Sequence, residues 1–139
     1  MNVEVLTLSG QKYSNEAKEV MLRTSNGDIV ILPNHEPFLA IAVPGALTIV
    51  NKDNAVDVFS IFGGVIDVSA DKVKILVDEA EHADDLIESE IEEAISFAEA
   101  LKASAKDRTA LNQAQSLLDR HAVRLNVVRV RRHHHNKRR

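Results

Sequence analysis

The sequence predicts an α+β fold: an N-terminal antiparallel β-sandwich or barrel of about eight strands, followed by a C-terminal antiparallel hairpin of two helices. Up to about residue 82, short runs rich in Val and Ile alternate with turn signals, as in antiparallel sheets. Beyond residue 82, apolar residues recur at spacings of three and four, as in amphipathic helices. We therefore expect a sandwich domain at 1–82, a helical hairpin at 83–130 and a basic tail at 131–139.

The expected strands are short and are separated by turn residues. In chain order they are "VEVLTL", "EVMLRT", "IVIL", "FLAIAV", "ALTIV", "VDVFSIF", "VIDVS" and "KVKILVDEA". Asn26-Gly27 fits a hairpin turn, because both residue types tolerate positive φ. Gly63-Gly64 lacks the surrounding pattern of a phosphate loop, and it predicts a bulge or a strand corner where two backbones approach closely.

The two expected helices run from Leu86 to about Ala105 and from about Thr109 to Val128. Asp84 or Asp85 can serve as the N-cap of the first helix. The short connection "SAKDR" predicts antiparallel packing of the two helices.

The net charge of −4 conceals an uneven distribution along the chain. From Asp78 to Glu99 there are ten acidic residues and no Lys or Arg, whereas from Arg124 to Arg139 there are seven cationic residues and no acidic one. An antiparallel hairpin would place the acidic start of its first helix beside the basic end of its second. We expect these charges to pair, with a small and salt-sensitive contribution from each exposed pair.

Composition excludes several classes of chemistry. The chain has no cysteine, which rules out disulfides, thiol catalysis and cysteine metal sites. The start "MNVEVLTLSG" is neither basic nor strongly apolar, and no run approaches the roughly 20 apolar residues of a membrane helix. We expect a soluble cytosolic protein that reaches a membrane only through a partner.

The histidine in "ILPNHEPFLAI" is the first candidate for chemistry. Its acidic neighbour Glu36 would point away from His35 in an extended segment, so a catalytic pair is not expected. Pro33 and Pro37 bracket a tight loop in which the imidazole can bond backbone groups or a partner.

Two charged segments offer further candidates. The acidic run lacks the DxDxDG pattern of a calcium loop and reads as a solvated helix face, so we expect no metal. The tail "RVRRHHHNKRR" could be a simple solubilising tail, dock on an acidic protein, or bind nucleic acid or a metal through His133, His134 and His135. No nucleophile, base and orienting group assemble, so we expect interaction surfaces and no enzyme.

The stretches "GDIVILPNHEPFLA", "VPGALTIV" and "IFGGVIDVSADKVKILVDEAEHADDL", together with the helical hairpin, resemble the epsilon subunit of the F-type ATP synthase, of the bacterial type. The resemblance covers nearly the whole chain. The residues in register with the family pattern are Gly27, Pro33, His35, Pro37, Pro44, Gly45, Gly63 and Gly64.

The resemblance implies a non-catalytic rotor subunit of the central stalk, peripheral at the cytoplasmic face of the membrane. The sandwich would bind the gamma subunit and the membrane c-ring, through Ser25, Asn26, Gly27, Asp28 and His35. No nucleic acid is expected among the partners.

The resemblance also implies that the hairpin regulates ATP hydrolysis. Folded down, it would pack on the sandwich; extended, it would reach the alpha and beta catalytic subunits and inhibit them. The residues expected to contact an acidic segment of the catalytic subunits are Arg108, Arg120, Arg124 and Arg129.

One family feature is altered in this sequence. Some bacterial members bind ATP through an Ile/Leu-Asp-x-x-Arg-Ala motif at the start of the first helix. Here Ile87, Glu90 and Ile91 stand in place of the aspartate, the arginine and the alanine. A carboxylate in place of the arginine repels phosphate, so we expect neither ATP nor another cofactor to bind.

A second interpretation is a β-sandwich adaptor, unrelated to ATP synthesis, that binds nucleic acid or an acidic protein through its basic C-terminal tail. The tail supports this alternative, which leaves the Gly, Pro and His register unexplained.

Overall fold

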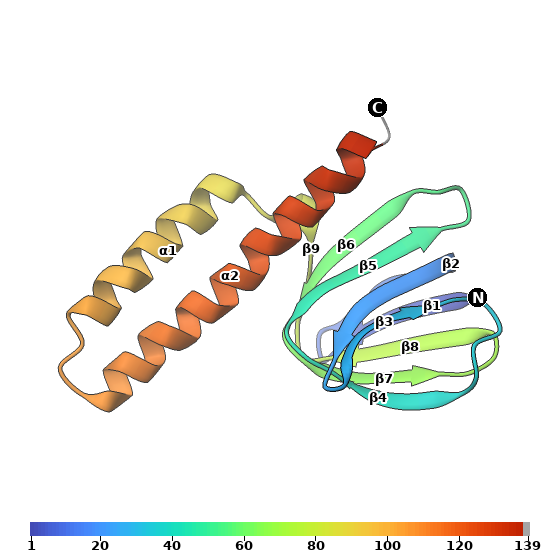
Figure 1. Cartoon of the computed structure of the whole chain (residues 1–139), viewed down its shortest axis with the longest axis horizontal. Helices are drawn as coiled ribbons and strands as arrows, with labels where there is room; N and C mark the ends of the chain where they lie inside the picture. The colour runs from blue at the N-terminus through green and yellow to red at the C-terminus, as the bar shows by residue number, and fades with distance from the viewer. Residues whose placement is uncertain (138–139) are drawn as a thin grey trace.

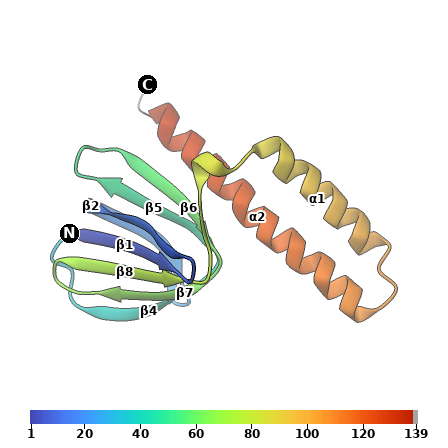
Figure 2. The ribbon, with the colours of Figure 1, turned by 180° about the vertical axis from the view of Figure 1, so that it is seen from behind.

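The computed structural model describes residues 1–137, as a β-sandwich beside a long helical hairpin (Figures 1 and 2). The strands are β1 (Asn2–Thr7), β2 (Gly10–Thr24), β3 (Gly27–Ile31), β4 (Phe38–Ala42), β5 (Gly45–Asn51), β6 (Val56–Ile61), β7 (Gly64–Val68), β8 (Lys72–Val77) and β9 (Ala80–His82). They are followed by the 3-10 helix η1 (Ala83–Asp85), α1 (Glu88–Ala103) and α2 (Arg108–Lys137). The predicted α+β class is confirmed.

The strands form one curled sheet in the order β1-β8-β7-β4-β2-β5-β6-β9, with β3 beside β2. The 15-residue strand β2 pairs with β1 in its first half and with β5 in its second half, with a break in register between Ala17 and Glu19. Because β1 also pairs with β8, the sheet folds back on itself and encloses a core. The β1–β8 pair is parallel, unlike the antiparallel arrangement that we predicted throughout.

The core is built from every second side chain along the strands, on the face that points inward. Val3 and Val5 of β1, Ile66 of β7 and Val73 and Ile75 of β8 are among its fully or almost fully buried members. Burying each Val or Ile side chain contributes about 1.5–3 kcal/mol before the entropy of ordering is subtracted. This alternation also decides which side chains of the same strands face outward.

Gly64 marks the close backbone approach that the glycine pair predicted. A Cβ atom at this position would lie 2.1 Å from the carbonyl oxygen of Leu76 and 2.8 Å from the Cα atom of Val77. Only glycine therefore allows β7 to pair with β8 at this point.

The β2–β3 hairpin differs in detail from the prediction. Ser25 and Asn26 occupy the turn between the paired residues Thr24 and Gly27, and the positive φ belongs to Gly27 (113°) and not to Asn26. The Thr24 hydroxyl donates to the Gly27 carbonyl oxygen and accepts from the Asn26 amide, which satisfies the turn locally.

The start of α1 also corrects the prediction. Asp84 and Asp85 are not its N-cap, because they belong to η1, which His82 caps by accepting a hydrogen bond from the Asp84 amide at 3.0 Å. The helix begins at Glu88 after Ile87, whose side chain makes no capping bond.

The predicted basic tail is largely helical, because α2 continues to Lys137 instead of ending near Val128. Ion pairs from Arg131 to Asp84 and from Arg132 to Glu88 hold its last turns against η1 and the start of α1. The expected pairing of the acidic and basic segments is thus confirmed. The last two residues of the predicted tail, 138–139, lie outside the described residues.

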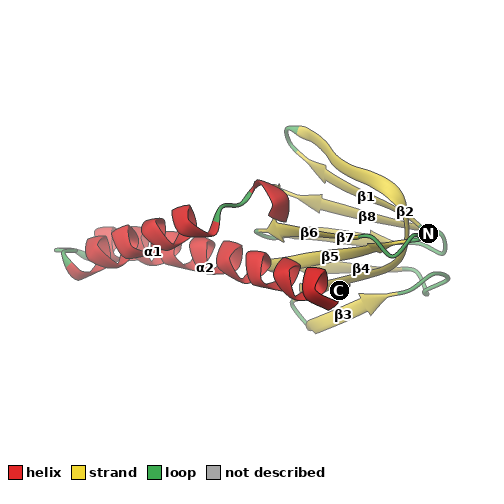
Figure 3. Ribbon diagram, turned by 90° about the horizontal axis from the view of Figure 1, so that it is seen from above, coloured by secondary structure: helices red, strands yellow, loops and turns green. Residues whose placement is uncertain are grey.

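The hairpin touches the sandwich mainly through the second half of α2. Val127 packs on Val58 of β6 and on Ala83 of η1, and all three are almost fully buried. Helix α1 packs along α2, and the two helices extend together away from the sheet (Figure 3). Within residues 1–137, no helix is both long and apolar enough to cross a membrane.

Candidate interaction surfaces

The expected contact residues of the sandwich do not lie together. The turn residues Ser25 to Asp28 lie at the start of β3, whereas His35 lies in the loop that follows the far end of this strand. The Asn34 amide in that loop bonds to the Ala70 carbonyl oxygen between β7 and β8. The sequence therefore predicted one contact surface from residues that the fold places at opposite ends of β3, with the turn 25–28 at one end and His35 beyond the other.

Asp28 already has a cationic partner within the chain. Its Oδ1 atom accepts from Nε of Arg23, the residue opposite on β2, at 2.8 Å, and both side chains are more than half exposed. The hydrogen bond from Arg23 and the charge of its guanidinium lower the pKa of Asp28. A basic group on a partner would have to share this carboxylate with Arg23.

His35 shapes its loop, as expected for an imidazole between two prolines. Its Nδ1–H donates to the Glu36 carbonyl oxygen at 2.9 Å, and its ring packs edge-on against Phe38 with centroids 5.0 Å apart. Asn34 has a positive φ of 64°, which turns the chain just before it. The exposed ring therefore stands at the start of β4.

An exposed apolar row crosses β4, β7 and β8 on the outer face of the sheet. Ile41 pairs with Val65, and Val65 pairs with Leu76, while Leu39 lies two residues before Ile41 on the same face. Their exposed fractions are 72% (Leu39), 60% (Ile41), 38% (Val65) and 45% (Leu76). A contiguous apolar row of this kind is typical of a protein-docking face. Sequence reasoning missed this row, although the alternation of "FLAIA" contains its first half.

The two central arginines of the predicted inhibitory set contact the sandwich. Arg124 donates through Nε to Glu81 at 2.8 Å, and Arg120 pairs with Glu79. Both guanidinium groups lie over the ring of Phe62, with Cζ 4.1 Å (Arg120) and 5.2 Å (Arg124) from its centroid. We call Phe62, Glu79, Glu81, Arg120 and Arg124 the latch.

The other two arginines of that set lie outside the latch. Arg108 is the first residue of α2, at the tip of the hairpin, and Arg129 lies on the exposed side of α2. The four arginines therefore do not form one cluster in this conformation.

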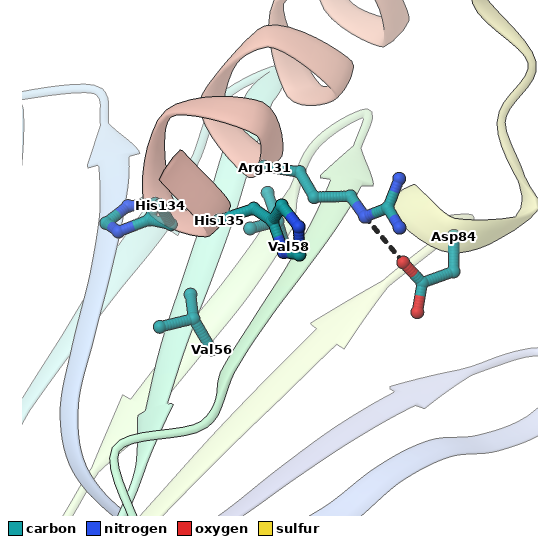
Figure 4. A pocket seen from close by; sticks show the side chains of 6 residues that line it. All are labelled: Val56, Val58, Asp84, Arg131, His134 and His135. Atoms are coloured by element: carbon teal, nitrogen blue, oxygen red, sulfur yellow. Dashed lines mark ion pairs between the residues drawn. The ribbon is translucent and has the colours of Figure 1, made fainter. Parts of the chain in front are cut away.

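The end of α2 makes a second contact with the sandwich. The Nε atom of Arg131 lies 2.6 Å from Oδ1 of Asp84, beside a cavity of about 170 Å³ (Figure 4). Val56 and Val58 of β6 form the floor of this cavity, and His134 and His135 line it from α2. No group of three His, Asp or Glu side chains suited to a metal occurs in residues 1–137.

The altered ATP motif faces a cavity of about 250 Å³ between α1 and α2. Ile87, Glu90 and Ile91 line it together with Glu81, Asp85, Leu86, His121 and Arg124. The carboxylates of Glu81, Asp85 and Glu90 would repel a phosphate group in this cavity. The guanidinium of Arg124 would not offset this repulsion, because it is already paired with Glu81.

A β-sandwich with an exposed apolar face, and with a helical hairpin held against it by an apolar contact and by ion pairs, is typical of a protein-interaction module. Residues 1–83 match the family model described as the beta-sandwich domain of the ATP synthase delta/epsilon chain. The chain belongs to this family, which confirms the resemblance. It is 37% identical over 136 residues to the ATP synthase epsilon chain of Neisseria meningitidis serogroup C, covering 96% of each chain. It is 34% identical over 132 residues to that of Herpetosiphon aurantiacus, covering 95% of this chain and 96% of the relative.

Solved structures share the fold at low sequence identity. A chain of the Euglena gracilis mitochondrial ATP synthase, solved with its c-ring, aligns with a TM-score of 0.76 and 20% identity, over 86% of this chain and 76% of its own. A chain of the Tetrahymena thermophila mitochondrial ATP synthase, from its central stalk and c-ring, aligns with a TM-score of 0.59 and 17% identity, over 92% and 96%. The unrelated adaptor is not favoured, because the family match spans the sandwich and two arginines of the supposed tail are paired within the chain.

Proposed function

We propose that this chain is a non-catalytic rotor subunit in the central stalk of a proton-translocating ATP synthase, peripheral at the cytoplasmic face of the membrane. Its membership of the delta/epsilon chain family supports this role, and so does the occurrence of its fold in central stalk assemblies. The observation that carries the proposal is the apolar row on β4, β7 and β8, a docking face on strands that α2 does not cover.

The apolar row is the proposed anchor on the gamma subunit. Its four side chains are large, aliphatic and adjacent across three strands, so a partner can bury them together. Phe38 points to the opposite, core-facing side of β4 and is partly buried there, so the row begins at Leu39.

The β2–β3 turn is the proposed contact with the c-ring. Ser25, Asn26 and Gly27 are exposed, and Asp28 offers a carboxylate beside them. Because Arg23 shares that carboxylate, the contact presents both charges to the polar loops of the ring.

The hairpin is the proposed regulatory element. In the docked conformation, Arg120 and Arg124 are occupied by Glu79, Glu81 and Phe62. Extension of the hairpin would free these two guanidinium groups for an acidic segment of the catalytic subunits. Docking on the sandwich and inhibition of ATP hydrolysis would then compete for the same side chains.

Binding to the purified cognate gamma subunit, measured by calorimetry, tests the anchor. Ile41→Glu would place a charge in the centre of the apolar contact and should weaken binding at least about thirtyfold, equivalent to about 2 kcal/mol. Leu8→Glu is the matched control, because Leu8 is 94% exposed in the β1–β2 turn and lies outside the row. Equal affinity of wild type and Ile41→Glu would remove the row from the interface, and absence of wild-type binding would reject the stalk assignment.

A further inference from the structure

His121 occupies the contact between the hairpin and the sandwich without a role in the function proposed above. It lies on α2 between the two latch arginines, one residue after Arg120 and three before Arg124. Its half-buried ring faces the 250 Å³ cavity, which Glu81 of β9 and Glu90 of α1 also line. Docking of the hairpin beside Glu81 therefore adds to the burial of this side chain.

The hydrogen bond of His121 requires a neutral imidazole. Its Nδ1 atom lies 3.3 Å from Nη1 of the Arg124 guanidinium. Because a guanidinium can only donate, Nδ1 must be the acceptor and must carry its lone pair. A proton on Nδ1 would break this bond and place a second cation against Arg124, the most enclosed arginine of the latch.

Charges of both signs surround the ring. Glu81 of β9, Asp85 of η1 and Glu90 of α1 line the same cavity and favour the imidazolium, whereas Arg120 and Arg124 of α2 oppose it. Glu79, between β8 and β9, is paired with both arginines. Burial of the ring, then Arg124 and Arg120, outweigh Glu81 and lower the pKa of His121.

We propose that His121 makes docking of the hairpin sensitive to pH, so that acidification weakens the contact between α2 and the Glu79–Glu81 segment. In the undocked hairpin the ring is hydrated and takes up a proton more readily than in the docked one. Docking is therefore fully stable above the ordinary histidine pKa of about 6.5 and weakens as the pH falls below it. Under the proposed function, on which this consequence rests, mild acid would favour the extended, inhibitory hairpin.

Thiol labelling of the full chain measures docking directly, because the chain has no cysteine of its own. Val58 is 1% exposed beneath α2, and Val58→Cys is close to isosteric, so its thiol reacts with iodoacetamide only when the hairpin lifts. The reference is Lys12→Cys, an exposed thiol that corrects for the pH dependence of the reagent. The ratio of the two labelling rates should rise as the pH falls from about 7.5 to about 5.5, by at most about tenfold per pH unit for one proton.

Histidine variants in the Val58→Cys background assign the response. His121→Gln keeps a neutral acceptor for Arg124 and should make the ratio independent of pH, whereas His133→Gln, on the exposed side of the same helix, should respond as wild type does. A response that persists in His121→Gln would overturn the proposal, and its loss in His82→Gln would move the sensor to the cap of η1. An NMR titration that places the imidazole pKa of His121 at or above about 6.5 would also overturn the proposal. None of these measurements involves the synthase, so their failure would leave the stalk assignment untouched.

Discussion

The latch predicts that two neighbouring arginines contribute unequally to docking. Arg124→Ala removes a side chain that is only 16% exposed and hydrogen-bonded to the side chain of Glu81, which is 27% exposed. Arg120→Ala removes one that is 37% exposed and paired with Glu79, which is 47% exposed. Solvent screens the second pair much more than the first.

The magnitudes follow from this difference in exposure. Loss of a well-shielded charged hydrogen bond costs about 1.5–3 kcal/mol, which lowers the ratio of docked to undocked hairpin by roughly tenfold to 150-fold. Loss of an exposed ion pair and an exposed cation–π contact costs about 1 kcal/mol, or about fivefold. Arg124→Ala should therefore loosen the hairpin roughly two to 30 times more than Arg120→Ala.

The assay is the labelling rate of the thiol introduced by Val58→Cys, measured at about pH 7.5, where His121 is neutral in both states. The melting temperature of each variant checks that the sandwich itself remains folded. An equal or larger effect of Arg120→Ala would refute the argument from burial, and no effect of either variant would show that the apolar contact around Val127 holds α2 alone.

Three further predictions concern the sandwich. Gly64→Ala should lower the free energy of unfolding by about 3 kcal/mol in urea denaturation, because the added Cβ would meet the β8 backbone. Gly45→Ala is the control: the nearest neighbours of a Cβ atom there lie at 4.0 Å, so the free energy of unfolding should change by less than about 1 kcal/mol. Equal effects of the two substitutions would contradict the close approach of β7 and β8 at Gly64. Burial, followed by the charge of Asp57, raises the pKa of Tyr13 to about 12, so the absorbance titration of this single tyrosine should have its midpoint there and not near 10. Because the unfolded chain loses that proton first, the tyrosine's contribution to stability should be intact below about pH 10 and decline between about pH 10 and 12. Asp28→Lys should weaken coupling of proton pumping to ATP hydrolysis in membrane vesicles, and unchanged pumping would remove Asp28 from the ring contact.

Local sequence patterns predicted most of the helices and strands. The structure differs from the prediction where contacts between residues distant in the sequence determine an element or its pairing. The three-residue strand β9 exists because it pairs with β6. The parallel β1–β8 pair joins the two ends of the sandwich, which no local pattern encodes. Helix α2 continues past Val128, where Arg131 forms an ion pair with Asp84 of η1 and Arg132 forms one with Glu88 of α1.

The candidate surfaces follow the same division. The role of His35 in its loop was predictable, because the two prolines and the imidazole act within a few residues of each other. The attraction between the acidic and basic segments was also predictable, but the partner of each arginine was not, since Phe62 and Glu79 reach the latch from other parts of the chain. The exposed row around Ile41 depends on which face of β4 the core occupies, and short apolar runs leave that open.

The most direct test of a sandwich anchor with a regulatory hairpin is ATP hydrolysis by the cognate catalytic complex, stripped of this subunit and supplied with either the full chain or a chain that ends at Leu86. The shortened chain keeps β9 and η1, so its sandwich retains all of its strands. We predict that both chains bind the gamma subunit and that only the full chain inhibits hydrolysis. Equal inhibition by both chains, or inhibition by neither, would contradict the regulatory role of the hairpin, and failure of both to bind would contradict the anchor.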